Sequence, residues 1–225
     1  MQRLLRLLWM CLAGVVLVAV FLVALYRDVP PPATPLMLLR LAEGYGIDTS
    51  WRSLDKISPF LVRAVITGED PEFCHHRGFE PGSLTAAWHR YSDLREPIAQ
   101  AGTISMQTAD SLYLLPGHGW LHQIPSDSFT FLLELAWSKR RILEVYLNVV
   151  EWGRGIYGAE AASQHYFHTS AGRLTPDQAV RLAAILAAPL AGTGDAAALA
   201  RAGAILQHIV AVPVWEPLPC GEQLG

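Results

Sequence analysis

The chain of 225 residues is poor in charge and in cysteine, and both shortages narrow the class of protein it can be. Charged residues make up 16% of the chain and leave a net charge of −3. Such a chain lacks the basic surface on which nucleic-acid binding depends, so we expect no nucleic-acid partner. The three cysteines match no metal-ligand spacing, and the sequence therefore indicates no metal site built from cysteine.

One stretch lacks charge altogether and is long enough to cross a membrane. Residues 7–26 are uncharged and almost all apolar, which is the length that a bilayer-spanning helix needs. Arg3 and Arg6 precede it, so the positive-inside rule places the N-terminus in the cytoplasm and the rest of the chain outside the plasma membrane. A cleavable signal peptide is the alternative, but its apolar region is usually shorter. We predict an uncleaved single-pass anchor.

The cysteines outside the anchor then face an oxidising compartment. Cys74 and Cys220 could form a disulfide there, but nothing in the sequence places them close together. We therefore expect two unpaired thiols.

The rest of the chain predicts one mainly α-helical domain without internal repeats. Prolines between residues 28 and 35 indicate a stiff, extended connection, and residues 35–42 a short helix that lies on the bilayer or packs normally. Further helices are expected at 84–92, 129–152 and 196–210. The predicted division is a cytoplasmic N-terminus with its anchor, a juxtamembrane spacer, a globular domain and a tail, at residues 1–27, 28–50, 51–212 and 213–225.

One predicted helix has clear ends and an unusual pair of acids. Ser58 can cap its start, Pro59 suits its first position, and Pro71 ends it. Glu69 and Asp70 then lie at the helix C-terminus, where the macrodipole repels negative charge. An acid there should have a raised pKa, as a general base near neutral pH requires. A solvated pair of acids is the alternative.

The residues that follow carry a family resemblance. The chain has the pattern Glu-Asp-x-x-Phe-x-x-His-x-Gly, formed by Glu69, Asp70, Phe73, His76 and Gly78. It resembles the first signature of the peptidoglycan glycosyltransferases, in particular the monofunctional biosynthetic transglycosylases. The stretch from Lys139 to Asn148 matches the fourth signature, Lys-x-x-Ile-Leu-x-x-Tyr-Leu-Asn, at every fixed position. The resemblance extends over about residues 51–206 and ends with a weaker fifth signature at Arg201, Ile205 and Leu206.

The second signature is degraded. Thr103, Ile104 and Gln107 match it, whereas Gly102, Met106 and Asp110 replace a serine, a glutamine and a lysine. The resemblance assigns that lysine to the pyrophosphate of a lipid-linked sugar. An aspartate there would repel such a group.

The third signature, Arg-Lys-x-x-Glu, is lost. His122, Gln123 and Ser126 stand at its fixed positions. Pro125 predicts that a helix begins near Ser126, whose free N–H groups could then bind phosphate. Asp127 lies one residue from the missing glutamate, which on a helix means a rotation of about 100°.

The resemblance implies a lysozyme-like domain that polymerises lipid II into glycan strands at the bacterial inner membrane. The reaction would be an inverting glycosyl transfer with loss of undecaprenyl pyrophosphate, and Glu69 would be the base that deprotonates the sugar 4-hydroxyl. A divalent ion, Mg²⁺ or Mn²⁺, would accompany the pyrophosphate. Partners would be lipid II, the growing glycan strand, the membrane and cell-wall synthesis proteins. The implied substrate-binding residues are Asp70, Phe73, His76, Thr103, Gln107, Lys139 and Asn148.

Two functions follow from this mixed pattern. Intact Glu69 and Lys139 favour an enzyme, with slow polymerisation. Asp110, Gln123 and Ser126 favour a non-catalytic, membrane-anchored relative that binds a lipid-linked glycan or a cell-wall synthesis partner. We favour the enzyme, because an inactive site has no evident reason to keep the first signature complete.

Overall fold

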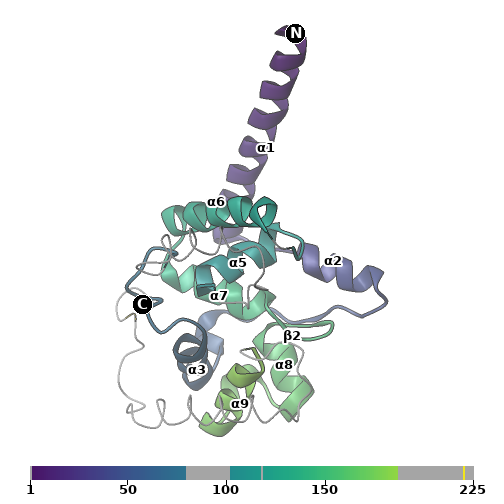
Figure 1. Cartoon of the computed structure of the whole chain (residues 1–225). Coiled ribbons are helices and arrows are strands. Elements are labelled where there is room, and N and C mark those ends of the chain that lie inside the picture. The colour runs from purple at the N-terminus through teal and green to yellow at the C-terminus, as the bar shows by residue number, and fades with distance from the viewer. Residues whose placement is uncertain (1, 80–101, 118, 187–219, 221–225) are drawn as a thin grey trace.

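The computed structural model describes residues 2–79, 102–117, 119–186 and 220, and this part of the chain is mainly helical (Figure 1). The helices predicted at 84–92 and 196–210 lie outside the described residues, as does the tail apart from Cys220. The helices are α1 (Gln2–Asp28), α2 (Pro35–Ala42), α3 (Pro59–Glu69), α5 (Ile104–Tyr113), α6 (Trp120–Ala136), α7 (Lys139–Val149), α8 (Gly158–Phe167) and α9 (Pro176–Leu186), with short 3-10 turns at η1 (Leu54–Lys56) and η2 (Ala171–Arg173).

A small sheet connects the N-terminal segment to the middle of the domain. Its strands are β1 (Asp48–Thr49), β2 (Glu151–Gly153) and β3 (Ile156–Tyr157), in the order β1-β3-β2. β3 is parallel to β1 and antiparallel to β2. The sheet thereby holds the chain that enters α3 against the turn that leaves α7.

Helix α7 forms the centre of the core. Ile142, Leu143 and Tyr146 are completely buried. Helices α5 and α8 pack against α7, α6 packs on α5, and α3 packs on α9. The predicted apolar stripe of α3 faces the core, and α3 ends at Glu69, just before Pro71, as predicted.

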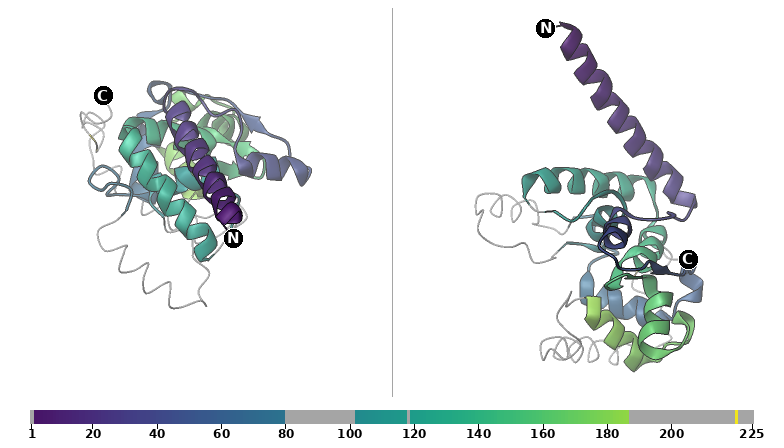
Figure 2. Two further views of the ribbon diagram at one scale, coloured as in Figure 1. Left: turned by 90° about the horizontal axis from the view of Figure 1, so that it is seen from above. Right: turned by 90° about the vertical axis from the view of Figure 1, so that its right-hand side faces the viewer.

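The C-terminal end of α1 is docked on the domain. The Trp137 indole N–H donates to the Val23 carbonyl at 2.8 Å, and the Arg141 guanidinium donates to the carbonyls of Tyr26 and Val29 at 2.8 and 3.0 Å. The rest of α1 extends away from the domain (Figure 2), and its stretch Leu5–Asp28 is long and apolar enough to cross a membrane. The anchor and the domain core are therefore in direct contact.

The predicted continuous helix at 129–152 is wrong. The helix is interrupted at Trp137, and a new helix, α7, begins at Lys139. Helix α7 ends at Val149, before β2. Ser138 causes the restart, because its side-chain oxygen accepts the Arg141 N–H at 3.2 Å as an N-cap.

The predicted helix start near Ser126 is also wrong. Helix α6 begins at Trp120 and continues through Pro125. A proline inside a helix costs about 3 kcal/mol, but the buried side of α6, with Ser126, Thr130 and Leu133, packs without interruption. This packing outweighs the local preference, so no phosphate-binding helix start exists at Ser126.

The expectation of unpaired thiols is wrong as well. Cys74 and Cys220 form a disulfide, with 5.0 Å between their Cα atoms. They are 146 residues apart in sequence, so only the folded chain reveals their proximity.

Candidate active site

The buried carboxylate of Asp70 joins the first and second signatures. It accepts hydrogen bonds from the His76 ring at 2.9 and 3.0 Å and from the Ile104 backbone N–H at 2.9 Å. The Nδ1 atom of His76 accepts the Gly78 N–H at 3.1 Å, so the ring hydrogen lies on Nε2 and is donated to Asp70. The negative charge also faces the positive end of α5. Asp70 therefore closes the loop after α3 against the start of α5.

Thr103 and Gly78 make a second connection between the same segments. The Thr103 hydroxyl donates to the Gly78 carbonyl at 2.6 Å and accepts the Met106 N–H at 3.2 Å as the N-cap of α5. Gly78 has φ +86, and a Cβ atom there would lie 2.8 Å from the Thr130 methyl group. Only glycine fits this turn after α3, because it packs against Thr103 at the start of α5 and against Thr130 of α6.

Glu69 is held by a chain of two hydrogen bonds that starts at α7. The buried Tyr146 hydroxyl donates to Gln107 Oε1 at 2.9 Å, and Gln107 Nε2 donates to Glu69 Oε2 at 3.2 Å. Burial, with the nearby carboxylates of Glu69 and Asp70, raises the pKa of Tyr146 well above its usual value, so this hydroxyl stays protonated. Glu69 therefore faces the stretch from Gly102 to Gln107.

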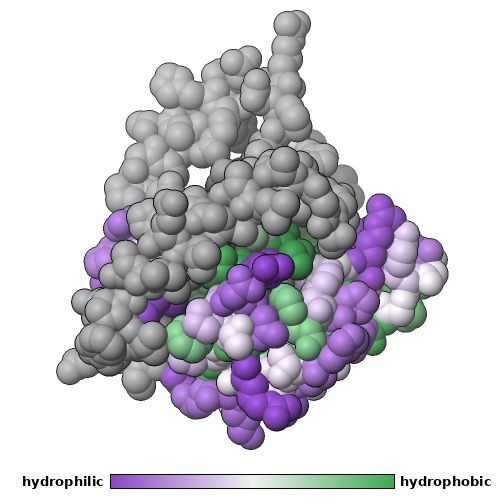
Figure 3. Space-filling view, turned by 90° about the horizontal axis from the view of Figure 1, so that it is seen from below, coloured by the Kyte–Doolittle hydropathy of each residue, from purple (hydrophilic) through white to green (hydrophobic). Residues whose placement is uncertain are grey.

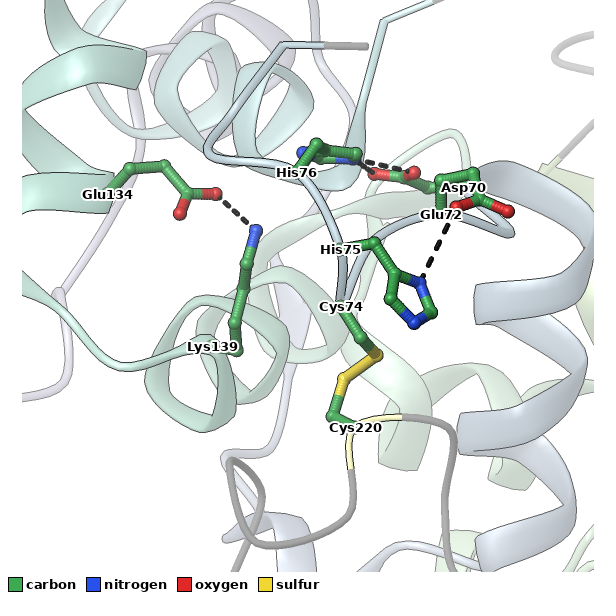
Figure 4. Close-up of a disulfide and its surroundings, with 8 residues drawn as sticks. All are labelled: Asp70, Glu72, Cys74, His75, His76, Glu134, Lys139 and Cys220. Carbon is green, nitrogen blue, oxygen red and sulfur yellow. Dashed lines mark hydrogen bonds and ion pairs between the residues drawn. A yellow bond between two sulfur atoms is a disulfide. The ribbon is translucent and has the colours of Figure 1, made fainter. Parts of the chain in front are cut away.

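Lys139 forms a buried ion pair beside the first signature (Figure 4). Its Nζ lies 2.7 Å from Glu134 Oε1 and 4.5 Å from the centre of the Phe73 ring. The Ser105 hydroxyl donates to the same glutamate oxygen. The side chains of Lys139 and Glu134 are 10% and 7% exposed, so most of the lysine charge is offset by its partner.

Asp110, an altered position of the second signature on α5, faces altered positions of the third signature on α6. The carboxylate of Asp110 accepts a hydrogen bond from Ser126, and His122 and Asp127 lie close enough to influence it electrostatically. Gln123 Nε2 donates to Asp127 Oδ1 at 2.7 Å. Burial raises the pKa of both Asp110 and Asp127. This part of the site carries negative charge where the family pattern carries positive charge.

Asn148 serves a different segment from the other candidate residues. Its side chain accepts the Arg52 N–H at 2.7 Å and donates to the carbonyls of Arg52 and Glu144 at 2.8 and 2.7 Å. These bonds attach the chain before η1 to α7. The predicted contact of Asn148 with substrate stays a prediction.

Three residues of this site, Ser105, Glu134 and Tyr146, have no role that the sequence alone predicts. Tyr146 and Ser105 lie inside the fourth and second signatures, so the sequence indicates their positions but not their hydrogen-bond partners. Glu134 lies five residues before Lys139, on the other side of the break between α6 and α7. The sequence feature that could have indicated its role is a carboxylate next to an apolar stripe.

Comparison with known proteins identifies the family of this chain. The family described as Transglycosylase matches residues 38–210. A biosynthetic peptidoglycan transglycosylase of Caulobacter vibrioides is 50% identical over 191 residues, covering 84% of this chain and 82% of the relative. Proteins of the same name from Rhodospirillum centenum and Pseudomonas putida strain W619 are 47% and 41% identical, covering 83% and 84% of this chain and 81% of each relative. The chain belongs to the transglycosylase family. Within it, the relatives are biosynthetic peptidoglycan transglycosylases, the group that the first and fourth signatures indicate.

The raised pKa of Asp110 predicts how stability depends on pH. The folded chain holds the Asp110 proton more tightly than the unfolded chain does. The stabilisation of the folded state by this proton is therefore complete below the unfolded pKa and is lost as pH rises through the folded pKa. Asp110→Asn keeps the shape without the charge. Its gain in melting temperature over wild type should be larger at neutral pH than near the ordinary aspartate pKa of about 3.9.

Asp177→Asn is the matched control, because Asp177 is 62% exposed and pairs only with Arg181 among the ion pairs of the described residues. It should show no such gain. An Asp110→Asn protein that melts below wild type at neutral pH would contradict a buried, charge-sensitive carboxyl at this position.

Proposed function

We propose that this protein polymerises lipid II into peptidoglycan glycan strands by inverting glycosyl transfer. The observation that carries the proposal is the position of Glu69 at the end of the hydrogen-bonded chain from Tyr146 through Gln107. A general base must be held in one orientation at the reacting proton. Family membership supports the same chemistry.

In the proposed reaction, Glu69 takes the proton of the sugar 4-hydroxyl on lipid II. That oxygen then forms a bond to the anomeric carbon of the growing strand, and the bond from this carbon to undecaprenyl pyrophosphate breaks. Gln107 orients the Glu69 carboxylate, and Asp70, His76 and Thr103 position the segments that hold it. Their contribution is orientation, which can account for a large part of a rate enhancement.

Departure of the pyrophosphate is the weaker half of the proposed mechanism. Lys139 and Phe73 lie next to the first signature, but Glu134 offsets the lysine charge. Asp110 adds a negative charge near the altered third signature. We therefore propose slow turnover with lipid II binding retained.

A divalent ion, Mg²⁺ or Mn²⁺, is proposed to accompany the pyrophosphate. Among the described residues no group of three His, Cys, Asp or Glu side chains could hold a metal by itself. A magnesium ion shared with phosphate oxygens needs only one or two carboxylates. Asp110 fits this role, since its buried Oδ1 has no hydrogen-bond partner, and Asp127 lies nearby. The ion would supply only part of the positive charge that the lysine and arginine side chains supply in the family pattern, and assays before and after chelation test it.

The proposed location is the bacterial inner membrane, with α1 as the anchor, the N-terminus in the cytoplasm and the domain in the periplasm. Large apolar side chains are exposed on α6, which lies on the side of the domain from which α1 rises (Figure 2), at Leu121, Ile124, Phe131 and Leu135. The face opposite α1 is mostly hydrophilic where it is described (Figure 3). This asymmetry supports membrane contact along α6. Cell-wall synthesis proteins are the proposed further partners.

Glu69→Gln tests the proposed base. The amide cannot accept the 4-hydroxyl proton, so polymerisation of lipid II in detergent should fall by about 10²-fold or more while lipid II binding stays near that of wild type. Glu72→Gln is the control, because Glu72 follows on the same loop but is 65% exposed. Wild-type protein that binds lipid II yet forms no more polymer than Glu69→Gln would favour the non-catalytic alternative.

Restoring the family pattern tests the account of the leaving group. The combined change Asp110→Lys, His122→Arg, Gln123→Lys and Ser126→Glu places a lysine against a glutamate where Asp110 and Ser126 now pair. Turnover of lipid II should rise by about tenfold or more. Ser126→Glu alone should not raise it, because it sets two carboxylates together. A restored protein no faster than wild type would contradict the account.

A further inference from the structure

We infer that Cys220 is a positioning residue for the proposed base and acts through its disulfide with Cys74. The inference rests on the proposed function, since it concerns the loop that follows Glu69. It assigns a catalytic consequence to a residue that lies outside every signature and 146 residues from its disulfide partner.

The disulfide lies inside the first signature (Figure 4). Cys74 falls between Phe73 and His76, and both cysteines are buried, with 9% and 6% of their surface exposed. Phe73 is completely buried beneath Lys139, and His76 donates to Asp70. The disulfide therefore joins the loop between Phe73, which makes its apolar contact, and His76, which makes its polar contact.

This position lets the disulfide influence the orientation of Glu69. The loop from Asp70 to His76 is a closed turn, because its two ends are hydrogen-bonded to one another. Asp70 also holds the first N–H of α5, and α5 carries Gln107, which contacts Glu69. A shift of Cys74 therefore moves His76 relative to Asp70. Because Glu69 directly precedes Asp70, this movement also changes the position of Glu69 relative to Gln107 on α5.

Formation of the bond depends on the compartment. The two thiols lose two electrons and two protons to an oxidant of the disulfide class, which is reduced to two thiols as the Cys74 to Cys220 bond forms. Such oxidants act outside the cytoplasm, where disulfides persist. The loop thus acquires its last constraint only on the side of the membrane where the proposed substrate is polymerised.

Single and double serine variants test the inference. Cys74→Ser, Cys220→Ser and the double variant should each lower kcat for lipid II polymerisation by about tenfold, with KM changed by less than about twofold, because orientation of the base is affected rather than substrate binding. The three losses should be equal, since the cysteines act as one unit. A thiol reductant should lower wild-type kcat to the same value and leave the double variant unchanged.

Cys11→Ser is the matched control, because Cys11 is a free cysteine on α1. It should leave kcat and its response to the reductant as in wild type. Unpaired thiols at Cys74 and Cys220 in oxidised wild-type protein, measured by mass spectrometry after alkylation, would overturn the inference. So would a reduced wild-type protein with unchanged kcat.

Hydrogen exchange separates this inference from the proposed function. Reduction should increase exchange in residues 70–79 and 102–107 even in a protein that forms no polymer. Inactive wild-type protein with this increase would refute the proposed function and support the positioning of the loop. Unchanged exchange in both segments would refute the positioning itself.

Discussion

The arrangement of the site depends on one buried carboxylate. Asp70 is 1% exposed, and a buried charge is tolerated only when hydrogen bonds or opposite charges replace its hydration. Its partners are the His76 ring and the Ile104 N–H, one from the loop after α3 and one from the start of α5. Satisfying Asp70 therefore requires the two segments to meet, and it places Gln107, one helical turn into α5, against Glu69.

The two halves of the proposed reaction have different support in this chain. The side that takes a proton from the acceptor is complete, with Glu69, Gln107 and Tyr146 in one hydrogen-bonded chain. The side that faces the pyrophosphate departs from the family pattern at Asp110 and Ser126, and these two residues are in contact. Asp110 and Ser126 meet at the interface of α5 and α6, and neither takes part in the hydrogen-bonded chain that ends at Glu69.

Local chemistry in the sequence predicted the features that depend on few residues. Pro59 and Pro71 predicted the ends of α3, and the family resemblance assigned Glu69 and Gln107 to one site, where the two side chains are in contact. The failures depend on contacts between distant segments. Packing on α5 keeps α6 helical through Pro125, and the fold brings Cys220 to Cys74. Helix propensity and the spacing of residues in the sequence do not predict contacts between such distant segments.

The most direct test of this account is the kcat of Asp70→Asn for lipid II polymerisation, measured on protein whose helix content matches wild type. Asparagine keeps the shape but replaces one acceptor oxygen with an NH₂ group. In one orientation this group lies against the His76 Nε2–H, and in the other it lies against both the His76 Nε2–H and the Ile104 N–H. The account predicts that kcat falls by about tenfold or more while lipid II affinity changes little. An Asp70→Asn protein that polymerises lipid II at the wild-type rate would contradict the claim that this carboxylate organises the site.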